Sequence, residues 1–167
     1  FSAKTHQLLA KINESGYLSS VRCYHTLNAL RAHGYDQFIM SGCPAFYELG
    51  HLSTPFAESI HVSKIAFATG RKYLTLPGMD QQQIDLILFL SEKFKGKQFS
   101  VAFHDPIHKH KAKTLELITT LEKHNIPYHD ISGSAQNLRD FYNGVDAQIG
   151  YRVHSHIFMS SIQKPSI

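Results

Sequence analysis

The chain has 167 residues, of which 43% are hydrophobic and 18% are charged. A chain of this length and composition is typical of one globular domain that buries its core without a disulfide or metal staple. No apolar run approaches the roughly 20 residues that a membrane-spanning helix needs, which excludes an integral membrane protein. The formal charge of +4 comes from dispersed Lys and Arg residues, which disfavours a nucleic-acid partner and suits a small anionic ligand.

The cysteine content and the chain ends indicate the compartment and the domain context. Cys23 and Cys43 make neither a disulfide framework nor a C-x-x-C motif, so we expect a reducing, cytoplasmic environment. The sequence starts at Phe1 without a methionine and stops at Ile167 in what reads as a strand cut short. We therefore expect residues 1–167 to form a single domain that belongs to a longer chain, truncated at both ends.

In chain order, helical and strand patterns alternate. The apolar spacing of Leu8, Leu9 and Ile12 predicts a first amphipathic helix, which Gly16 ends. Helices are predicted over Ala3–Asn13, Thr26–His33, Asp80–Gly96, Lys111–Asn125, Ala135–Tyr142 and about Arg152–Ser161. Strands are predicted over Tyr17–Arg22, Asp36–Gly42, Lys64–Gly70, Lys97–Asp105, Ile126–Ser132 and Asp146–Gly150, with a looser stretch over Ala45–Ser63 and a last extended segment at Pro165–Ile167.

This alternation predicts an α/β fold. Short apolar strands separated by helices indicate parallel βαβ units, and right-handed crossovers place helices on both faces of the sheet. The expected architecture is therefore Rossmann-like, a parallel sheet with helices on both faces. In such a sheet the carboxyl ends of all strands share one edge, where ligands bind. That edge is expected to carry Arg22, Cys43, Arg71, His104, Asp105, Ser132, Gly133, Arg152 and His154.

Two arginines and a histidine at this edge suit an anion-binding active site. Arg22 and Arg152 each directly follow a strand, where an arginine fork beside a helix N-terminus binds phosphate or carboxylate. Either arginine could instead pair with a surface acid. His154 lies in the first turn of the last helix and can exchange a proton near neutral pH, or it could merely cap that turn. His156 is followed by an apolar run, which favours a core position.

Other candidate sites are less distinctive. The stretch "HDPIHKH", from His104 to His110, offers metal-ligand types, but its spacing matches no strong ligand motif and Pro106 interrupts it. It reads as a substrate-contacting or solvated loop, with metal binding left open. Gly42-Cys43-Pro44 could present a reactive thiol or form a tight turn around a small cysteine. The sequence contains neither a G-x-G-x-x-G nor a P-loop motif, which disfavours dinucleotide and nucleoside triphosphate binding.

Three stretches together resemble the polysaccharide pyruvyl transferase family. They are "SVRCYHTLNALRAHGY", "MSGCPAF" and "VDAQIGYRVHSHIFMSSIQKPSI", the last with a Gly-x-Arg-x-His core. The resemblance implies the C-terminal lobe of a two-lobed fold like that of GT-B glycosyltransferases, with the N-terminal lobe as its partner. It also implies an enzyme that moves the pyruvyl group of phosphoenolpyruvate onto two hydroxyls of a sugar to form a ketal, with no cofactor.

The resemblance implies roles for the site residues. Arg22 and Arg152 would hold the phosphate and carboxylate of phosphoenolpyruvate, and His154 would be the acid/base. We expect further substrate contacts from Cys43, His104 and Ser132 at the same edge. The family usually has an aspartate where this chain has Cys23, which could leave the arginine before it without an orienting carboxylate.

Two alternatives remain open at the level of the sequence. The first is a GT-B-type glycosyltransferase lobe that binds a nucleotide sugar, for which Asp130 or Asp140 could hold a ribose. The second is a non-catalytic binding domain derived from such an enzyme, which the Cys23 departure supports.

Overall fold

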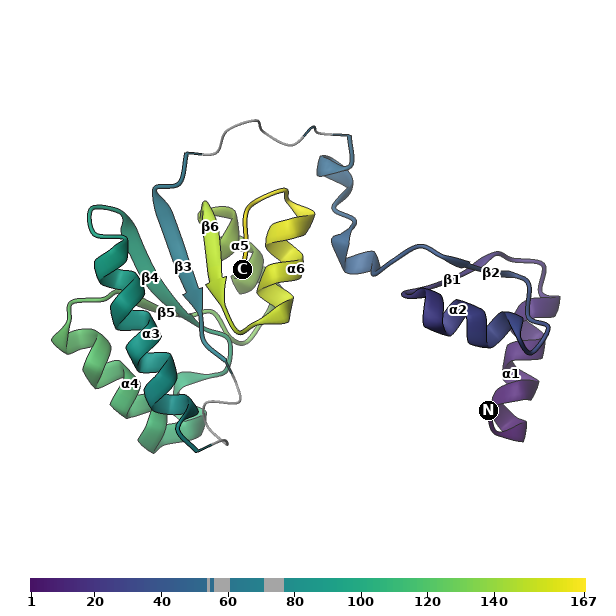
Figure 1. Ribbon diagram of the computed structural model, residues 1–167, viewed down its shortest axis with the longest axis horizontal. Coiled ribbons are helices and arrows are strands. Elements are labelled where there is room, and N and C mark those ends of the chain that lie inside the picture. The colour runs from purple at the N-terminus through teal and green to yellow at the C-terminus, as the bar shows by residue number, and fades with distance from the viewer. Residues whose placement is uncertain (54, 56–60, 71–76) are drawn as a thin grey trace. The chain divides into compact units, whose positions relative to one another are not determined.

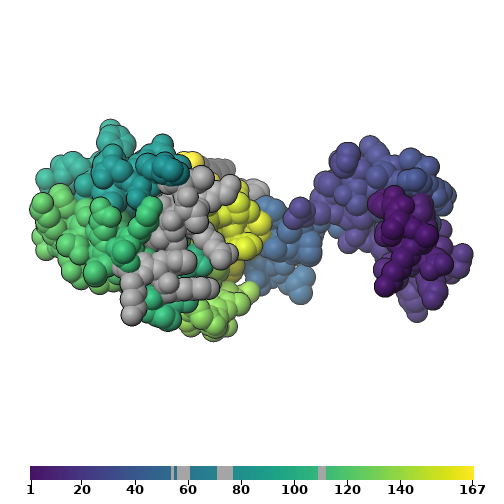
Figure 2. Space-filling model, turned by 90° about the horizontal axis from the view of Figure 1, so that it is seen from below, coloured from purple at the N-terminus to yellow at the C-terminus, as the bar shows by residue number. Residues whose placement is uncertain are grey.

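The computed structural model describes residues 1–53, 55, 61–70 and 77–167, and only the backbone of residues 109–111. The chain divides into two compact units, Phe1–Leu49 and Gly50–Ile167. Each unit has its own sheet and its own hydrophobic core, and each is described by itself (Figure 1; Figure 2 draws the same residues as a space-filling model).

The first unit consists of two helices and two strands that alternate along the chain. It contains α1 (Ala3–Glu14), β1 (Ser19–Val21), α2 (Tyr24–Arg31) and β2 (Phe38–Met40). The two strands pair in parallel, with Val21 opposite Met40. Leu27 and Leu30 of α2 pack on Tyr35 and Phe38, and apolar side chains of α1 pack against this cluster. Two short helical turns follow, η1 (Pro44–Phe46) and η2 (Leu49–His51).

The second unit is a parallel four-stranded sheet between two layers of helices (Figure 1). Its strands lie in the order β5-β4-β3-β6, and each neighbouring pair is parallel. The strands are β3 (Lys64–Ala68), β4 (Gln98–Phe103), β5 (Tyr128–Asp130) and β6 (Ala147–Gly150). The helices are α3 (Met79–Lys93), α4 (Lys111–Lys123), α5 (Ala135–Asn143) and α6 (Val153–Ser161), with a short turn η4 (Ile107–His110) before α4.

Each face of the sheet packs on its own pair of helices. On one face, Phe67 of β3 and Val101 of β4 are fully buried against apolar side chains of α3 and α4. On the other face, the small Ala66 and Ala102 leave room for Tyr142 of α5 and Met159 of α6. This alternation of side chains along the strands produces the two-layered core. The predicted α/β class, a parallel sheet covered by helices on both faces, is confirmed.

The described strands pair in two groups. β1 pairs with β2, and the strands of the second unit pair in the order β5-β4-β3-β6. The two groups belong to the two compact units, Phe1–Leu49 and Gly50–Ile167. The expectation that residues 1–167 form a single domain stays a prediction.

Two features fix the position of β6 beside β3. At its start, one carboxylate oxygen of Asp146 accepts hydrogen bonds from the backbone of Ser63 and Lys64 and from the Ser63 hydroxyl, at 2.8–2.9 Å. At its end, Gly150 has a φ of +138°, and a Cβ there would lie 2.4 Å from the carbonyl oxygen of Ala68. Only glycine permits this close backbone approach.

The last residues of the chain pair with the outer side of β6. Gln148 N–H donates to Pro165 at 3.0 Å, Ile167 N–H donates to Gln148 at 3.0 Å, and Gly150 N–H donates to Ile167 at 2.9 Å. The extended segment predicted at Pro165–Ile167 is thus a parallel addition to the sheet. Among the described residues, no helix is both long enough and apolar enough to cross a membrane.

Candidate functional site

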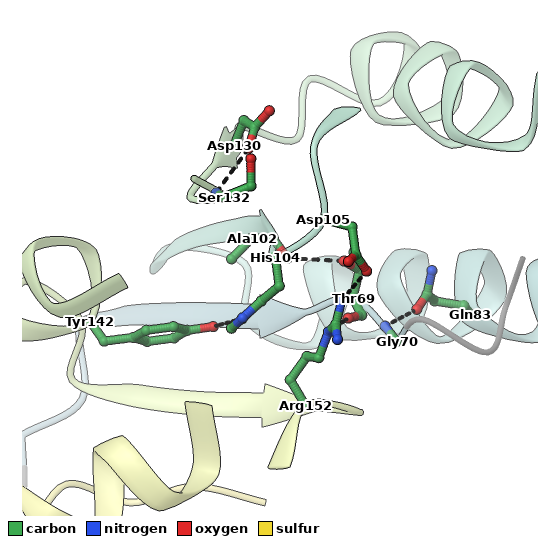
Figure 3. Close-up of polar contacts among 10 residues, drawn as sticks. All are labelled: Thr69, Gly70, Gln83, Ala102, His104, Asp105, Asp130, Ser132, Tyr142 and Arg152. Atoms are coloured by element: carbon green, nitrogen blue, oxygen red, sulfur yellow. Dashed lines mark hydrogen bonds and ion pairs between the residues drawn. The ribbon is translucent and has the colours of Figure 1, made fainter. Parts of the chain in front are cut away.

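The candidate site lies where the strands of the second unit end (Figure 3). Thr69 and Gly70 follow β3, His104 and Asp105 follow β4, and Arg152 follows β6. Because these strands are parallel, their carboxyl ends meet at one edge, and side-chain or backbone groups that follow three of them come into contact there. His104, Asp105 and Arg152 are therefore brought together, as the sequence analysis expected for this edge.

Arg152 connects the ends of three strands. It is the N-cap residue of α6, and its guanidinium Nη2 makes an ion pair with the carboxylate of Asp105. Its Nε donates a hydrogen bond to the carbonyl oxygen of Thr69 at 3.1 Å. The Arg152 side chain is 18% exposed and that of Asp105 is 30% exposed, so the pair is only partly open to solvent. These contacts hold the planar guanidinium in one orientation.

The Arg152 guanidinium keeps donors for a ligand. An arginine side chain has five N–H donors. One Nε and one Nη2 donor are used by Thr69 and Asp105, and no other hydrogen bond of this side chain occurs within residues 1–53, 55, 61–70 and 77–167. Three N–H donors of Arg152 thus have no partner among the described residues, and they lie at the N-terminal end of α6, where the backbone dipoles also favour an anion.

His104 is turned toward the interior. Its Nε2 shares a hydrogen bond of 2.8 Å with the hydroxyl of Tyr142, a side chain with no solvent exposure. Burial, and then the positive charge of Arg152, lower the pKa of His104 to about 4, although Asp105 acts in the opposite direction. Burial also raises the pKa of Tyr142 far above its usual range. At neutral pH the pair is therefore an uncharged imidazole beside a protonated phenol.

His154 is the exposed histidine of the site. It lies in the first turn of α6, two residues after Arg152, and its charge contributes to the lowered pKa of His104. The His154 side chain is exposed, whereas His104 is already engaged with Tyr142. The N-terminal end of α6 therefore carries both the Arg152 guanidinium and an exposed imidazole.

Ser132 follows β5 and is part of a loop held by Asp130. The Asp130 carboxylate accepts hydrogen bonds from the backbone N–H of Ser132 at 3.0 Å and of Ile107 at 3.2 Å. Burial alone would raise the pKa of Asp130, but these hydrogen bonds outweigh it and the pKa is lowered. Asp140, the other acid considered for a ribose, accepts from Gln136 at 2.6 Å.

Arg22 and Cys43 lie in the first unit. Arg22 follows β1 and is exposed, and Cys43 is the half-buried residue before η1. They follow the ends of the two paired strands β1 and β2 of that unit, and their contact with the substrate stays a prediction. Cys23 caps α2, and hydrogen bonds from Thr26 lower the pKa of its exposed thiol. Arg71, which was also expected at the edge, lies outside the described residues.

The histidine-rich stretch after β4 does not gather ligands in the part that the structure describes. His104 points to Tyr142, His108 is exposed, and the side chain of His110 lies outside the description. Across the described residues, no group of three or more His, Cys, Asp or Glu side chains could hold a metal ion. A cavity of about 630 Å³ exists at the other end of the strands, where Lys64 begins β3 and Gln98 begins β4, and it is remote from Arg152.

Sequence analysis did not identify three residues that contribute to the candidate site: Thr69, Tyr142 and Gln83. Thr69 acts through its backbone carbonyl, which has no side-chain signature. Tyr142 could have been suspected only as a polar aromatic on the apolar face of α5. Gln83 is a fully buried polar residue within α3, and the position of a glutamine in an amphipathic helix pattern is its sole sequence signal.

Comparison with protein-family models, with curated proteins and with solved structures gives no match to the chain.

Proposed function

We propose that this protein transfers the pyruvyl group of phosphoenolpyruvate onto two hydroxyls of a sugar in a polysaccharide or its precursor. The observation that carries the proposal is the guanidinium of Arg152, which Asp105 and Thr69 hold in place while three of its N–H donors have no partner among the described residues. The exposed His154 lies two residues away, at the same helix end. The resemblance of "GYRVHSH" to the Gly-x-Arg-x-His core of pyruvyl transferases supports the same assignment.

The proposed reaction needs an anion-binding group and a proton carrier. The methylene carbon of phosphoenolpyruvate takes a proton, which leaves an oxocarbenium-like centre at the adjacent carbon. One sugar hydroxyl attacks that carbon and releases its proton, the C–O bond to phosphate breaks, and phosphate departs with its bridging oxygen. The second hydroxyl then attacks the same carbon, loses its proton and closes the ketal. One released proton replaces the proton consumed, and the other leaves with phosphate.

The residues at the edge suit these steps. Arg152 would stabilise the charge on the departing phosphate, because oriented donors in a partly enclosed site favour developing charge. His154 would supply the first proton and take back a hydroxyl proton. His104, with its pKa lowered to about 4, is uncharged at neutral pH and would act as a hydrogen-bonding group beside the substrate. Ser132, and Arg22 and Cys43 of the first unit, stay predicted substrate contacts.

Calorimetric titration of phosphoenolpyruvate tests the proposal directly. The wild-type chain, Arg152→Ala and the matched control Arg31→Ala are compared, since Arg31 is an exposed arginine in the last turn of α2. We expect binding by the wild type and by Arg31→Ala, and at least about tenfold weaker binding by Arg152→Ala, as for loss of a charge-assisted contact. A chain that binds a nucleotide sugar but not phosphoenolpyruvate would contradict the proposal and favour a glycosyltransferase.

A turnover assay separates an enzyme from a binding domain. Phosphate release from phosphoenolpyruvate is measured with sugar acceptors, and the ketal product is identified by mass spectrometry. We expect His154→Ala to keep its affinity for phosphoenolpyruvate and to lose phosphate release.

The two cysteines are free thiols, consistent with a reaction proposed to take place in the cytoplasm.

A further inference from the structure

A single peptide group at the site binds two side chains at once. The carbonyl oxygen of Thr69 accepts from Nε of Arg152 at 3.1 Å, and the N–H of Gly70 donates to Oε1 of Gln83 at 2.8 Å (Figure 3). Both belong to the peptide between residues 69 and 70. A peptide group is planar and rigid, so the direction of its N–H determines the direction of its carbonyl. Gln83 and Arg152 are therefore coupled through the Thr69–Gly70 peptide, without a hydrogen bond between them.

Packing leaves this peptide little freedom. A Cβ at Gly70 would lie 2.8 Å from the Cβ of Tyr151, the residue before Arg152. The Tyr151 N–H in turn donates to the carbonyl of Ala68 at 3.0 Å. The end of β3 is thus pressed between α3, which carries Gln83, and the chain that leads into Arg152. A rotation of the peptide would move the carbonyl oxygen that holds Nε.

A glutamine at position 83 is unfavourable for the stability of the fold. Its side chain has 0% exposure, and its Nε2 has no hydrogen-bond partner in the described part of the chain. A buried donor without a partner destabilises the folded state, whereas methionine fills a similar volume and has no N–H or carbonyl group to satisfy. Such unsatisfied groups call for an explanation. Here the amide contributes one thing that methionine cannot, the acceptor for Gly70.

We propose that Gln83 is a positioning residue for Arg152 and acts through the Thr69–Gly70 peptide. Its Oε1 sets the direction of the Gly70 N–H, this sets the Thr69 carbonyl, and the carbonyl together with Asp105 aims the free N–H donors of Arg152. The identity of the ligand that these donors receive rests on the proposed function. The connection between Gln83 and Arg152 does not, and can be measured without a ligand.

NMR of the arginine side chain tests the connection alone. The Nε–H resonance of Arg152, assigned by its loss in Arg152→Lys, is followed in the wild type, in Gln83→Met and in the control Gln82→Met, which changes an exposed neighbour on the same helix. We expect faster exchange of this proton with solvent in Gln83→Met only. Equal protection in the wild type and Gln83→Met would overturn the proposal. Gln83→Glu keeps an acceptor oxygen for Gly70 and should restore the protection.

A double-mutant cycle tests the consequence for binding. We expect Gln83→Met to weaken phosphoenolpyruvate binding about tenfold in the wild-type background, a loss that misplacement of a binding group readily produces. In an Arg152→Lys background, which lacks Nε, it should add nothing further. Equal losses in both backgrounds would mean a general structural role and would overturn the proposal. If the wild type binds no phosphoenolpyruvate, the proposed function fails, while the exchange of the Arg152 Nε–H still decides the role of Gln83.

Discussion

Gly150 lies so close to the backbone of Ala68 that any side chain at position 150 would overlap it. The added Cβ would stand 2.4 Å from the carbonyl oxygen and 2.8 Å from the amide nitrogen of Ala68. These atoms belong to β3 in the middle of the sheet and cannot rotate away. The contact joins the ends of two strands immediately before the residues that build the site.

Gly150→Ala should accordingly destabilise the second unit strongly. We expect a loss of about 3 kcal/mol or more in the free energy of unfolding, because both the clash and the positive φ oppose a side chain. Urea denaturation followed by circular dichroism measures it. Gly50→Ala is the control, since a Cβ at that position meets nothing within 4 Å, and it should change the stability by less than about 0.5 kcal/mol. Equal effects of the two substitutions would contradict the packing described for β6.

Protonation of His104 should destabilise the fold at acid pH. The folded pKa of about 4 lies below the ordinary value of 6.5, so the unfolded chain binds the proton more tightly. Stability is complete above about pH 6.5 and falls as the pH drops toward 4, by up to about 3 kcal/mol over the window. Unfolding free energies measured between pH 7 and 4 should fall less steeply for His104→Gln than for the wild type. The exposed His124→Gln should keep the wild-type slope.

Tyr142→Phe isolates the hydroxyl that faces His104. The ring is fully buried and its packing is retained, but Nε2 of His104 loses the partner at 2.8 Å. We expect destabilisation by about 1–2 kcal/mol, the usual cost of leaving a buried polar group without its partner. Tyr128→Phe removes a hydroxyl that donates to Glu122 at the surface and should cost only a few tenths of a kcal/mol. Thermal unfolding of both variants compares them, and a reversed order would argue against the His104–Tyr142 hydrogen bond.

Asp146→Ala should loosen the start of β3 and β6. One carboxylate oxygen accepts three hydrogen bonds from Ser63 and Lys64, and these hold the pKa of Asp146 at about 2. The lowered pKa means that this contribution is present above the ordinary value of 3.8 and is lost as the pH falls toward 2. We expect a loss of about 1 kcal/mol at neutral pH, after allowance for the partial exposure of the group. Hydrogen exchange of the Lys64 amide should accelerate, whereas Glu92→Gln, which removes a surface ion pair, should leave it unchanged.

Local patterns in the sequence were sufficient to predict most of the elements and part of the site. Helices such as Ala3–Glu14 and Met79–Lys93 start and end near their predicted limits, because apolar periodicity and a following glycine are local signals. His104, Asp105 and Arg152 were placed at one edge because parallel strands all end on the same side. That rule required no knowledge of which strands are neighbours.

The same rule leaves Arg22 and Cys43 as predictions, because their strands pair with each other in the first unit. Which strands pair is decided by contacts between distant residues, and nothing local distinguishes β1 and β2 from the strands of the larger sheet. The roles of Gln83 and Tyr142 also escaped prediction. Each acts through a partner from another element, Gly70 or His104, so its role depends on tertiary packing. The proposed pyruvyl transfer rests on motif resemblance and on Arg152.

Because Pro165–Ile167 pairs with β6, the two edges of the four-stranded sheet differ. On that side the backbone groups of Gln148 and Gly150 are already occupied, so they offer no template to another chain. On the other side, β5 comprises only Tyr128–Asp130, and its exposed His129 and Asp130 are polar. A short edge strand with charged side chains, such as β5, resists edge-to-edge aggregation. Removing the Pro165–Ile167 pairing would therefore expose the longer and more apolar strand to self-association.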